Sequence, residues 1–306
     1  MKNKYKYLIF LVIFLVYLLI GFGTFRSQGN SASSVSSRVD TAHSSSNVTD
    51  KKINPALTRP TEAAKALAAD EMMQTSRDYR VVYDALLQTG SPKSGFYARE
   101  ILRRCFSLRK LGLRDVAVVT SQQEAARLLQ QERCGSFSSD ELSFDALRQA
   151  AVDPRFQVGL SEINENWSKA GANKPRHKEV FGEALQTNDP LLLQYVGSGL
   201  LSQHHESIRL GEMEFNGEPA LDSMRLAWIA AVCEGTGTAC GTGDAYVVDA
   251  CASLNLCEES RRLAMRALVA HKHGATHQPT FDAAYNIFVK AIQSKNVQLF
   301  FPDANP

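Results

Sequence analysis

From residue 61 onward, apolar side chains recur at intervals of three and four residues, and sustained alternation of apolar with polar residues is nearly absent. A helix with this spacing carries one apolar stripe, whereas a half-buried strand needs a period of two. The clearest stripes are Ala98, Ile101, Leu102, Cys105 and Leu108, and Phe281, Ala284, Tyr285, Phe288 and Ile292. The spacing therefore predicts an all-α fold for residues 61–306, in which only residues 114–120 suggest a strand.

Local signals mark where several of these helices begin. Ser121 with Glu124, and Ser138 with Glu141, have the Ser-x-x-Glu spacing of a capping box, in which each side chain bonds to the backbone N–H of the other residue. Thr280 precedes the final stripe and is the predicted N-cap of that helix. We therefore expect helices to start beside these three positions.

A five-residue pattern at residues 88–92 (QTGSP) recurs at residues 186–190 (QTNDP), with a fainter copy at residues 152–154. At the same offset Tyr97 aligns with Tyr195. In each copy one helix ends and a proline opens the next helix. The pattern predicts stacked helical hairpins, loosely similar to tetratricopeptide or Sel1-type repeats, although neither consensus is complete and local turn chemistry alone also produces it.

An uncharged apolar run occupies residues 8–25. As a helix it spans roughly 27 Å, which is near the ~30 Å thickness of the hydrocarbon core of a bilayer. Lys2, Lys4 and Lys6 precede it, so the positive-inside rule places residues 1–7 in the cytoplasm and exports the rest. We expect a single-pass signal-anchor in a bacterial inner membrane.

A cleaved signal peptide is the alternative, with an apolar stretch at residues 8–20 and with Gly21 and Gly23 as small residues near the cleavage site. Either interpretation exports everything that follows. Residues 26–60 hold nine serines and few large apolar residues, so they cannot bury enough apolar surface to offset the entropy of ordering. We expect this segment to be a flexible tether, and residues 61–306 to be an exported helical domain.

All six cysteines lie beyond residue 100, and their even number favours disulfides in an exported domain. Cys105 and Cys134 lie on or just after helices and are expected to join two neighbouring helices. The other four lie in a predicted helix–loop–helix segment at residues 222–257 and are Cys233, Cys240, Cys251 and Cys257. Nested pairing (233 with 257, 240 with 251) and crossed pairing both fit the spacing, and four cysteines allow three connectivities.

The cysteine-rich segment also contains a motif that consists of Trp228, Cys233, Gly235, Cys240 and Gly241, followed by two further cysteines. The motif resembles the C-terminal region of exported, Cys-containing helical proteins of Gram-negative bacteria, as does the turn at residues 90–92 that leads to Tyr97 and Cys105. The resemblance covers part of the exported domain and implies a periplasmic setting. Those proteins have no established activity, so the resemblance implies no catalytic residue.

The composition argues against several classes of function. A net charge of +2, from 34 Lys and Arg against 32 Asp and Glu, gives no basic stripe for nucleic acid. The histidines are conceivable metal ligands, and they include His271, His273 and His277 with His204 and His205. His271 and His273 are better explained as cations at a helix C-terminus, where they interact favourably with the helix dipole. The sequence therefore predicts no metal site and no cofactor.

These observations predict a membrane-anchored periplasmic module that binds another protein or the cell envelope, rather than an enzyme. Two alternatives stay open, namely a peptidoglycan-type hydrolase with an acidic site and a periplasmic assembly factor or chaperone. A carboxylate in an apolar cleft would favour the hydrolase, whereas an exposed apolar face would favour binding. Trp167 and Trp228 have apolar neighbours and are expected in the core rather than at a sugar site.

Overall fold

The computed structural model describes residues 62–91, 93–111, 117–157, 159–171 and 173–301. All of these residues belong to one compact unit, which lies within Thr58–Pro306. The predicted anchor (8–25) and tether (26–60) lie outside the described residues. Among the helices that are described, none combines the length and the apolar character that a membrane span requires.

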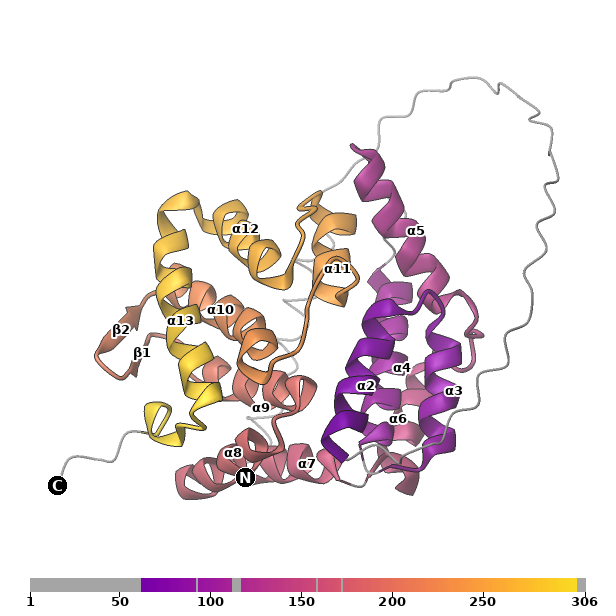
Figure 1. Cartoon of the computed structure of the whole chain (residues 1–306), viewed down its shortest axis with the longest axis horizontal. Helices are drawn as coiled ribbons and strands as arrows, with labels where there is room; N and C mark the ends of the chain where they lie inside the picture. The colour runs from indigo at the N-terminus through magenta and orange to yellow at the C-terminus, as the bar shows by residue number, and fades with distance from the viewer. Residues whose placement is uncertain (1–61, 92, 112–116, 158, 172, 302–306) are drawn as a thin grey trace, which may run out of the picture. The chain divides into compact units, whose positions relative to one another are not determined.

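The described unit is mostly helical, as the sequence period predicts (Figure 1). Its first helices are α2 (Glu62–Thr75), α3 (Tyr79–Thr89), α4 (Ser94–Leu111), α5 (Ser121–Gly135) and α6 (Phe144–Val152). A 3-10 turn, η2 (Pro154–Phe156), leads to α7 (Leu160–Ala170), α8 (Lys174–Thr187) and α9 (Pro190–Ser202). The remaining elements are β1 (Ser207–Leu210), β2 (Met213–Asn216), α10 (Glu218–Thr236), α11 (Ala245–Leu254), α12 (Arg261–His273), η3 (Ala275–His277), α13 (Gln278–Gln293) and η4 (Val297–Leu299).

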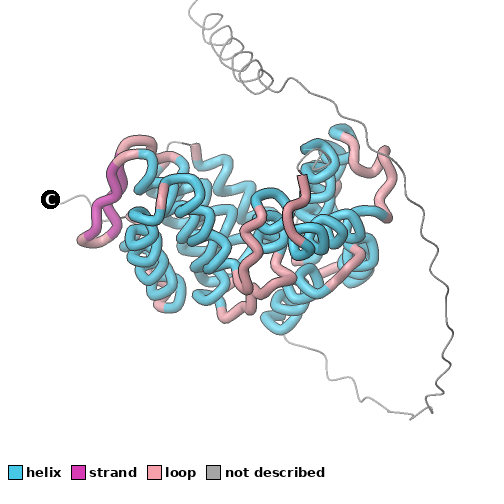
Figure 2. The backbone as a smooth tube through the Cα atoms, turned by 90° about the horizontal axis from the view of Figure 1, so that it is seen from above, coloured by secondary structure: helices cyan, strands magenta, loops and turns pink. Residues whose placement is uncertain are grey.

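The all-α expectation needs one correction, because β1 and β2 form an antiparallel hairpin at the edge of the helical body (Figure 2). Their side chains alternate: Ile208, Leu210 and Phe215 are buried, whereas the residues between them are exposed or half-buried. Gly211 makes the turn with a φ of 61°, a conformation that glycine adopts without strain. The expected strand does not form over residues 117–120, the described part of residues 114–120.

The aromatic core of the second half depends on two glycines of α9. Trp228 is fully buried, and its indole Nε1–H donates to the Leu193 carbonyl at 3.2 Å. A Cβ at Gly197 would overlap the Trp228 ring, and a Cβ at Gly199 would lie 2.7 Å from Nε1 of Trp167. Both tryptophans are therefore core residues, as predicted, and the glycines allow α9 to approach them closely.

The structure differs from the expectation at all three predicted helix starts. Thr120, not Ser121, is the N-cap of α5, and its Oγ accepts from the Gln123 N–H at 3.2 Å. The reciprocal bonds of the second capping box do form, at 3.0 and 3.3 Å, but they close a turn before α6 rather than open a helix. The final helix, α13, begins at Gln278, two residues before Thr280, because Pro279 fits the first helical turn.

The aligned turns share one local feature in the residues that the structure describes, 88–91 and 186–190: each begins where a helix ends at a left-handed residue. Helix α3 ends at Gly90 and α8 ends at Asn188, both in the left-handed conformation, with φ values of 58° and 52°. The aligned tyrosines then each contact the other copy. Tyr97 donates to Asp189 at 3.2 Å, and Tyr195 donates to Glu100. The two hairpins, α3–α4 and α8–α9, are thus joined by reciprocal hydrogen bonds.

All six cysteines are paired, in three disulfides. Cys105–Cys134 joins α4 to α5, as expected. The other two bridges are Cys233–Cys240 and Cys251–Cys257, so the pairing is neither nested nor crossed. The reason is that a left-handed residue ends each preceding helix, Gly237 after α10 and Asn255 after α11, and turns the chain back onto its own last turn.

Candidate functional site

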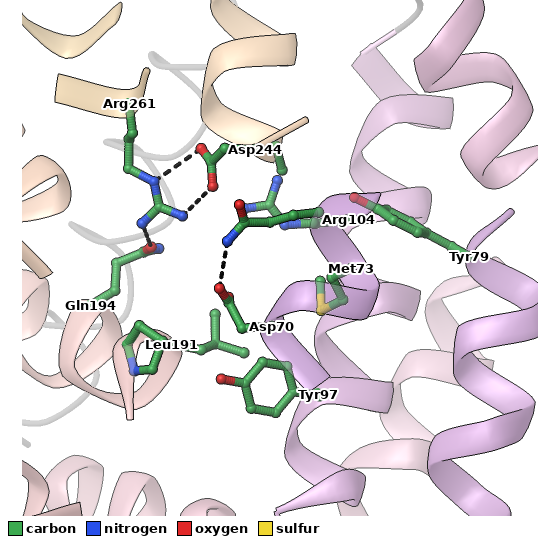
Figure 3. Close-up of a pocket in the computed structure, with 12 residues that line it drawn as sticks. Asp70, Met73, Tyr79, Tyr97, Arg104, Leu191, Gln194, Asp244 and Arg261 are labelled. Carbon is green, nitrogen blue, oxygen red and sulfur yellow. Dashed lines mark hydrogen bonds and ion pairs between the residues drawn. The ribbon is translucent and has the colours of Figure 1, made fainter. Parts of the chain in front are cut away.

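Two regions could carry function, and the first is a buried group of charged side chains where α2 and α4 meet α9, α11 and α12 (Figure 3). At its centre Arg261 forms a bidentate ion pair with Asp244: Nε donates to Oδ1 at 2.9 Å, and Nη2 donates to Oδ2. Nη1 of Arg261 donates to Gln194 Oε1 at 3.3 Å. The pair is almost fully excluded from solvent.

Local sequence explains the position of this pair. Asp244 is the N-cap of α11 and accepts from the Tyr246 N–H at 3.0 Å, while Arg261 is the first residue of α12. The Arg261 N–H also donates to the Cys240 carbonyl at 3.0 Å. Burial by itself would raise the pKa of Asp244, but the Arg261 guanidinium lowers that pKa below its ordinary value. The carboxylate therefore stays charged and holds two helix starts together.

The ring of Tyr246 lies between two guanidinium groups, with its centroid 4.9 Å from Arg261 and 5.1 Å from Arg104. Arg104 extends from α4, and its Nε lies 3.0 Å from Glu100, close enough for an ion pair although not aligned as a hydrogen bond. Burial opposes ionisation of Glu100, but hydrogen bonds from Arg103 and the nearby guanidinium charges lower its pKa. These contacts connect α4 to α11 and α12 through charge.

Asp70 of α2 faces a cavity of about 20 Å³ inside this network. Its Oδ2 accepts from Gln74 at 2.5 Å, and no ion pair to it is formed within the described residues. Burial raises its pKa, more than the Arg261 charge and the Gln74 bond lower it. A cavity of this size holds about one water molecule. Chemically, the region has room for a water, and its charged groups fix helices in place.

The second region is a surface groove of about 520 Å³ between α5 and α11. Its apolar lining comes from both helices and consists of Ala125, Ala126, Leu128, Leu129, Val247 and Val248. The two valines are buried at the base, whereas Leu128 is 51% exposed. A larger open hollow of about 690 Å³ lies beside Cys105–Cys134, but several of its lining residues are charged or polar.

The groove exists because α5 packs with its polar side inward. Gln123, Gln130 and Arg133 are buried, whereas none of the apolar residues of α5 is. Gln123 Nε2 donates to the Ala252 carbonyl at 3.2 Å, and Gln130 Nε2 donates to Asp249 at 2.6 Å. Hydrogen bonds to α11 thus replace the apolar contacts that usually attach a helix, and they leave the apolar stripe facing outward.

Arg133 completes this attachment at the C-terminal end of α5. Its Nε donates to the Ser76 carbonyl at 3.0 Å, and its Nη2 donates to the carbonyls of Gln74 and Gly243, each at 2.7 Å. The close approach requires glycine at 243, because a Cβ there would overlap the Gln74 carbonyl. One guanidinium therefore fixes α5 to both the end of α2 and the loop before α11.

Acidic residues surround the groove. Glu132 pairs with Arg77 at 2.6 Å. Glu258 and Glu259 also border it, and neither side chain has a hydrogen bond or ion pair within the described residues. Both follow directly after Cys257, whose bridge to Cys251 forms part of the groove wall. The spacing of these two cysteines predicts that they form bridges, but it does not predict the groove.

The other candidate residues do not assemble into a site. His273 and Lys272 both contact Asp222, at 2.8 and 2.7 Å, at the C-terminal end of α12. Across the described part of the chain, no group of three or more His, Cys, Asp or Glu side chains could hold a metal ion. Comparison with protein-family models, with curated proteins and with solved structures gives no match for this chain.

Proposed function

We propose that this chain is a membrane-tethered helical module that binds an apolar segment of a partner protein in the groove between α5 and α11. The observation that carries the proposal is the orientation of α5, whose buried residues are all polar and whose apolar residues are exposed or half-buried. Monomeric soluble proteins rarely leave contiguous apolar surface uncovered, and where they do it commonly marks an interaction site. A partner that covers Leu128 and Leu129 would remove this surface from water.

The buried network supports the same proposal over a hydrolase. A hydrolase needs its acidic group in a cleft that substrate can enter. Asp70 has the raised pKa of such a group, but its cavity of about 20 Å³ has room only for a water. A periplasmic assembly factor or chaperone would use the same groove and differ only in the protein that it binds.

The setting follows from the cysteines and from the N-terminal sequence. Three disulfides support an oxidising compartment, which for a bacterial chain is the periplasm. In this proposal residues 8–25 anchor the chain in the inner membrane, and residues 26–60 separate the helical unit from the bilayer. The unit is a set of stacked helical hairpins, of which α3–α4 and α8–α9 are the related copies.

Site-specific photo-crosslinking in cells tests the proposal. A benzophenone amino acid replaces Leu128 in the groove or, as a matched control, Leu263 on α12, which is 42% exposed. We expect a defined protein adduct from the groove position only, and we expect that protein, once identified and purified, to bind the chain at least tenfold more weakly after Ala125→Arg. Equal adducts from both positions, or binding unaffected by Ala125→Arg, would contradict the proposed function.

A further inference from the structure

We infer that the groove takes an amphipathic helix with a basic edge, and that Glu258 and Glu259 receive the lysine or arginine side chains of that edge. The inference rests on the proposed function and adds the chemistry of the partner. It concerns one surface, formed by α5, α11 and the residues that follow the Cys251–Cys257 bridge.

The secondary structure of the occupant follows from the backbone of the groove. The apolar lining of the groove comes from two helices, α5 and α11, whose N–H and C=O groups are already bonded along their own axes. An extended segment placed between them would therefore leave its own backbone groups unpaired on an apolar surface. A helix satisfies its backbone internally and can present side chains at i, i+3, i+4 and i+7 to the groove. The geometry therefore favours a helix over a strand.

The lining residues of α5 have the spacing that such a helix needs. Ala125, Leu128, Leu129 and Glu132 lie three or four residues apart and form one face of α5. Side chains of a third helix pack into the spaces between residues at these intervals. An occupant with leucine-sized residues on one side would cover Leu128.

The charge around the groove indicates which side chains the occupant carries beside its apolar face. Glu132, Glu258 and Glu259 bring three carboxylates, whereas Arg77 brings the only guanidinium among the groove-lining residues. The whole chain carries a net charge of +2, so this acidic border is a local feature rather than the average of the sequence. Since Arg77 already pairs with Glu132, the carboxylates left for a partner are those of Glu258 and Glu259.

The disulfide fixes where these two carboxylates lie. Cys251 and Cys257 both line the groove, and the acids follow Cys257 without an intervening residue. The same acids also precede α12, whose N-terminus favours negative charge. A purely structural role in starting α12 would make their removal lower stability, whereas a docking role makes their removal lower affinity for a basic partner.

The test uses three synthetic helical peptides that share one leucine stripe. Their remaining positions are all lysine in the first peptide, all glutamine in the second and all glutamate in the third. Binding is measured by fluorescence anisotropy to the full chain, with its disulfides intact, in phosphatidylcholine nanodiscs. We expect the lysine peptide to bind most tightly, and its affinity to fall roughly fivefold with the double variant Glu258→Gln/Glu259→Gln, because two exposed charge pairs are lost. The affinity for the glutamine peptide and the thermal midpoint should stay unchanged.

A matched variant controls for general electrostatics. Glu212→Gln/Glu214→Gln removes the same two charges from the β-hairpin, where both side chains are exposed. It should leave the affinity for the lysine peptide unchanged. Equal losses from both double variants, equal binding of the lysine and glutamate peptides, or a lower thermal midpoint with unchanged affinity would overturn the inference.

Leu128→Asp separates this inference from the proposed function. If that substitution abolishes binding of all three peptides while the peptides bind alike, the groove is a docking surface and only the basic partner is wrong. If no peptide binds, or if Leu128→Asp leaves binding intact, both proposals are overturned.

Discussion

The two sides of α11 contrast sharply. On its inner side Asp244 and Tyr246 belong to a buried network with Arg261 and Arg104, and on the side facing α5 Val248 lies at the base of an exposed apolar groove. Around α11, charged side chains are thus buried while the apolar side chain of Leu128 faces water, which is the reverse of the usual arrangement. The enclosed charges each have partners in the fold, whereas the apolar stripe of α5 is only partly covered within the described residues: Leu129 is half-buried and Leu128 is exposed. This difference is the basis for assigning stability to the interior and for proposing that the groove serves recognition.

The largest expected effect comes from breaking the central ion pair. Arg261→Met leaves the Asp244 carboxylate buried without its bidentate partner, which should cost about 3–5 kcal/mol of unfolding free energy. Urea unfolding followed by circular dichroism measures it. Arg262→Met, at the exposed neighbouring position, is the control and should cost less than about 1 kcal/mol. Equal effects of the two substitutions would show that the network does not stabilise the fold.

Removing single disulfides should give the next largest effects, in an order set by loop length. Cys105 and Cys134 are 29 residues apart, so replacing both with serine should cost roughly 3.5 kcal/mol by the chain-entropy model. Cys251 and Cys257 are only 6 apart, and their replacement should cost roughly 2.2 kcal/mol. Urea unfolding of the two double variants gives the order, and the reverse order would contradict the entropic explanation.

Asp189 gives a pH-dependent effect inside the fold. Burial raises its pKa from 3.8 to about 6, so the folded chain favours the protonated carboxyl. The stability that protonation provides is complete below about pH 3.8 and is lost as the pH rises through about 6. Asp189→Asn keeps an acceptor for Tyr97 and a helix N-cap, and it should stabilise the chain at pH 7.5 by about 2–3 kcal/mol, with no gain below pH 3.8.

The control for this prediction is Asp153→Asn, at a half-buried N-cap. Hydrogen bonds from Arg155 lower the pKa of Asp153, so its substitution should slightly destabilise the chain at pH 7.5. Urea unfolding of both variants from pH 3.5 to pH 8 compares them. A parent chain that is more stable than Asp189→Asn at pH 7.5 would refute the role assigned to burial.

The smallest effect on stability is expected in the groove. Leu128→Asp places a charge on a side chain that is already half exposed, so unfolding free energy should change by no more than about 0.5 kcal/mol. Leu192→Asp, at a fully buried position of α9, is the contrasting variant and should prevent folding. Thermal unfolding distinguishes the two, and a large loss for Leu128→Asp would mean that the apolar stripe holds the fold together.

Much of the fold can be predicted because its signals are local. The stripe that includes Ala98 and Cys105 is buried on α4, and the stripe that includes Phe281 is buried on α13. The β-hairpin was missed because strands of four residues give too few alternations to outweigh the helical period. The spacing of the cysteines alone does not predict the sequential disulfides, because these depend on the left-handed conformation of Gly237 and Asn255.

The groove could not be predicted, for a different reason. The helical spacing predicts that Ala125, Leu128 and Leu129 lie on one face of α5. It does not predict whether that face packs against the rest of the protein or is exposed to solvent. The deciding contacts are the hydrogen bonds of Gln123 and Gln130 to α11, which join residues more than a hundred positions apart. The sequence signal was the presence of long polar side chains on the opposite face, which could be buried only if they found such partners.

Methyl NMR of the full chain during titration with the leucine–lysine peptide tests the central claim most directly. The groove methyls of Ala125, Leu128, Leu129 and Val248 report on docking, and those of Leu191 and Met73 report on the buried network. Binding to the groove predicts saturable shift changes confined to the first group. Shift changes at Leu191 and Met73 with unchanged groove signals would contradict the claim that the groove is the docking surface.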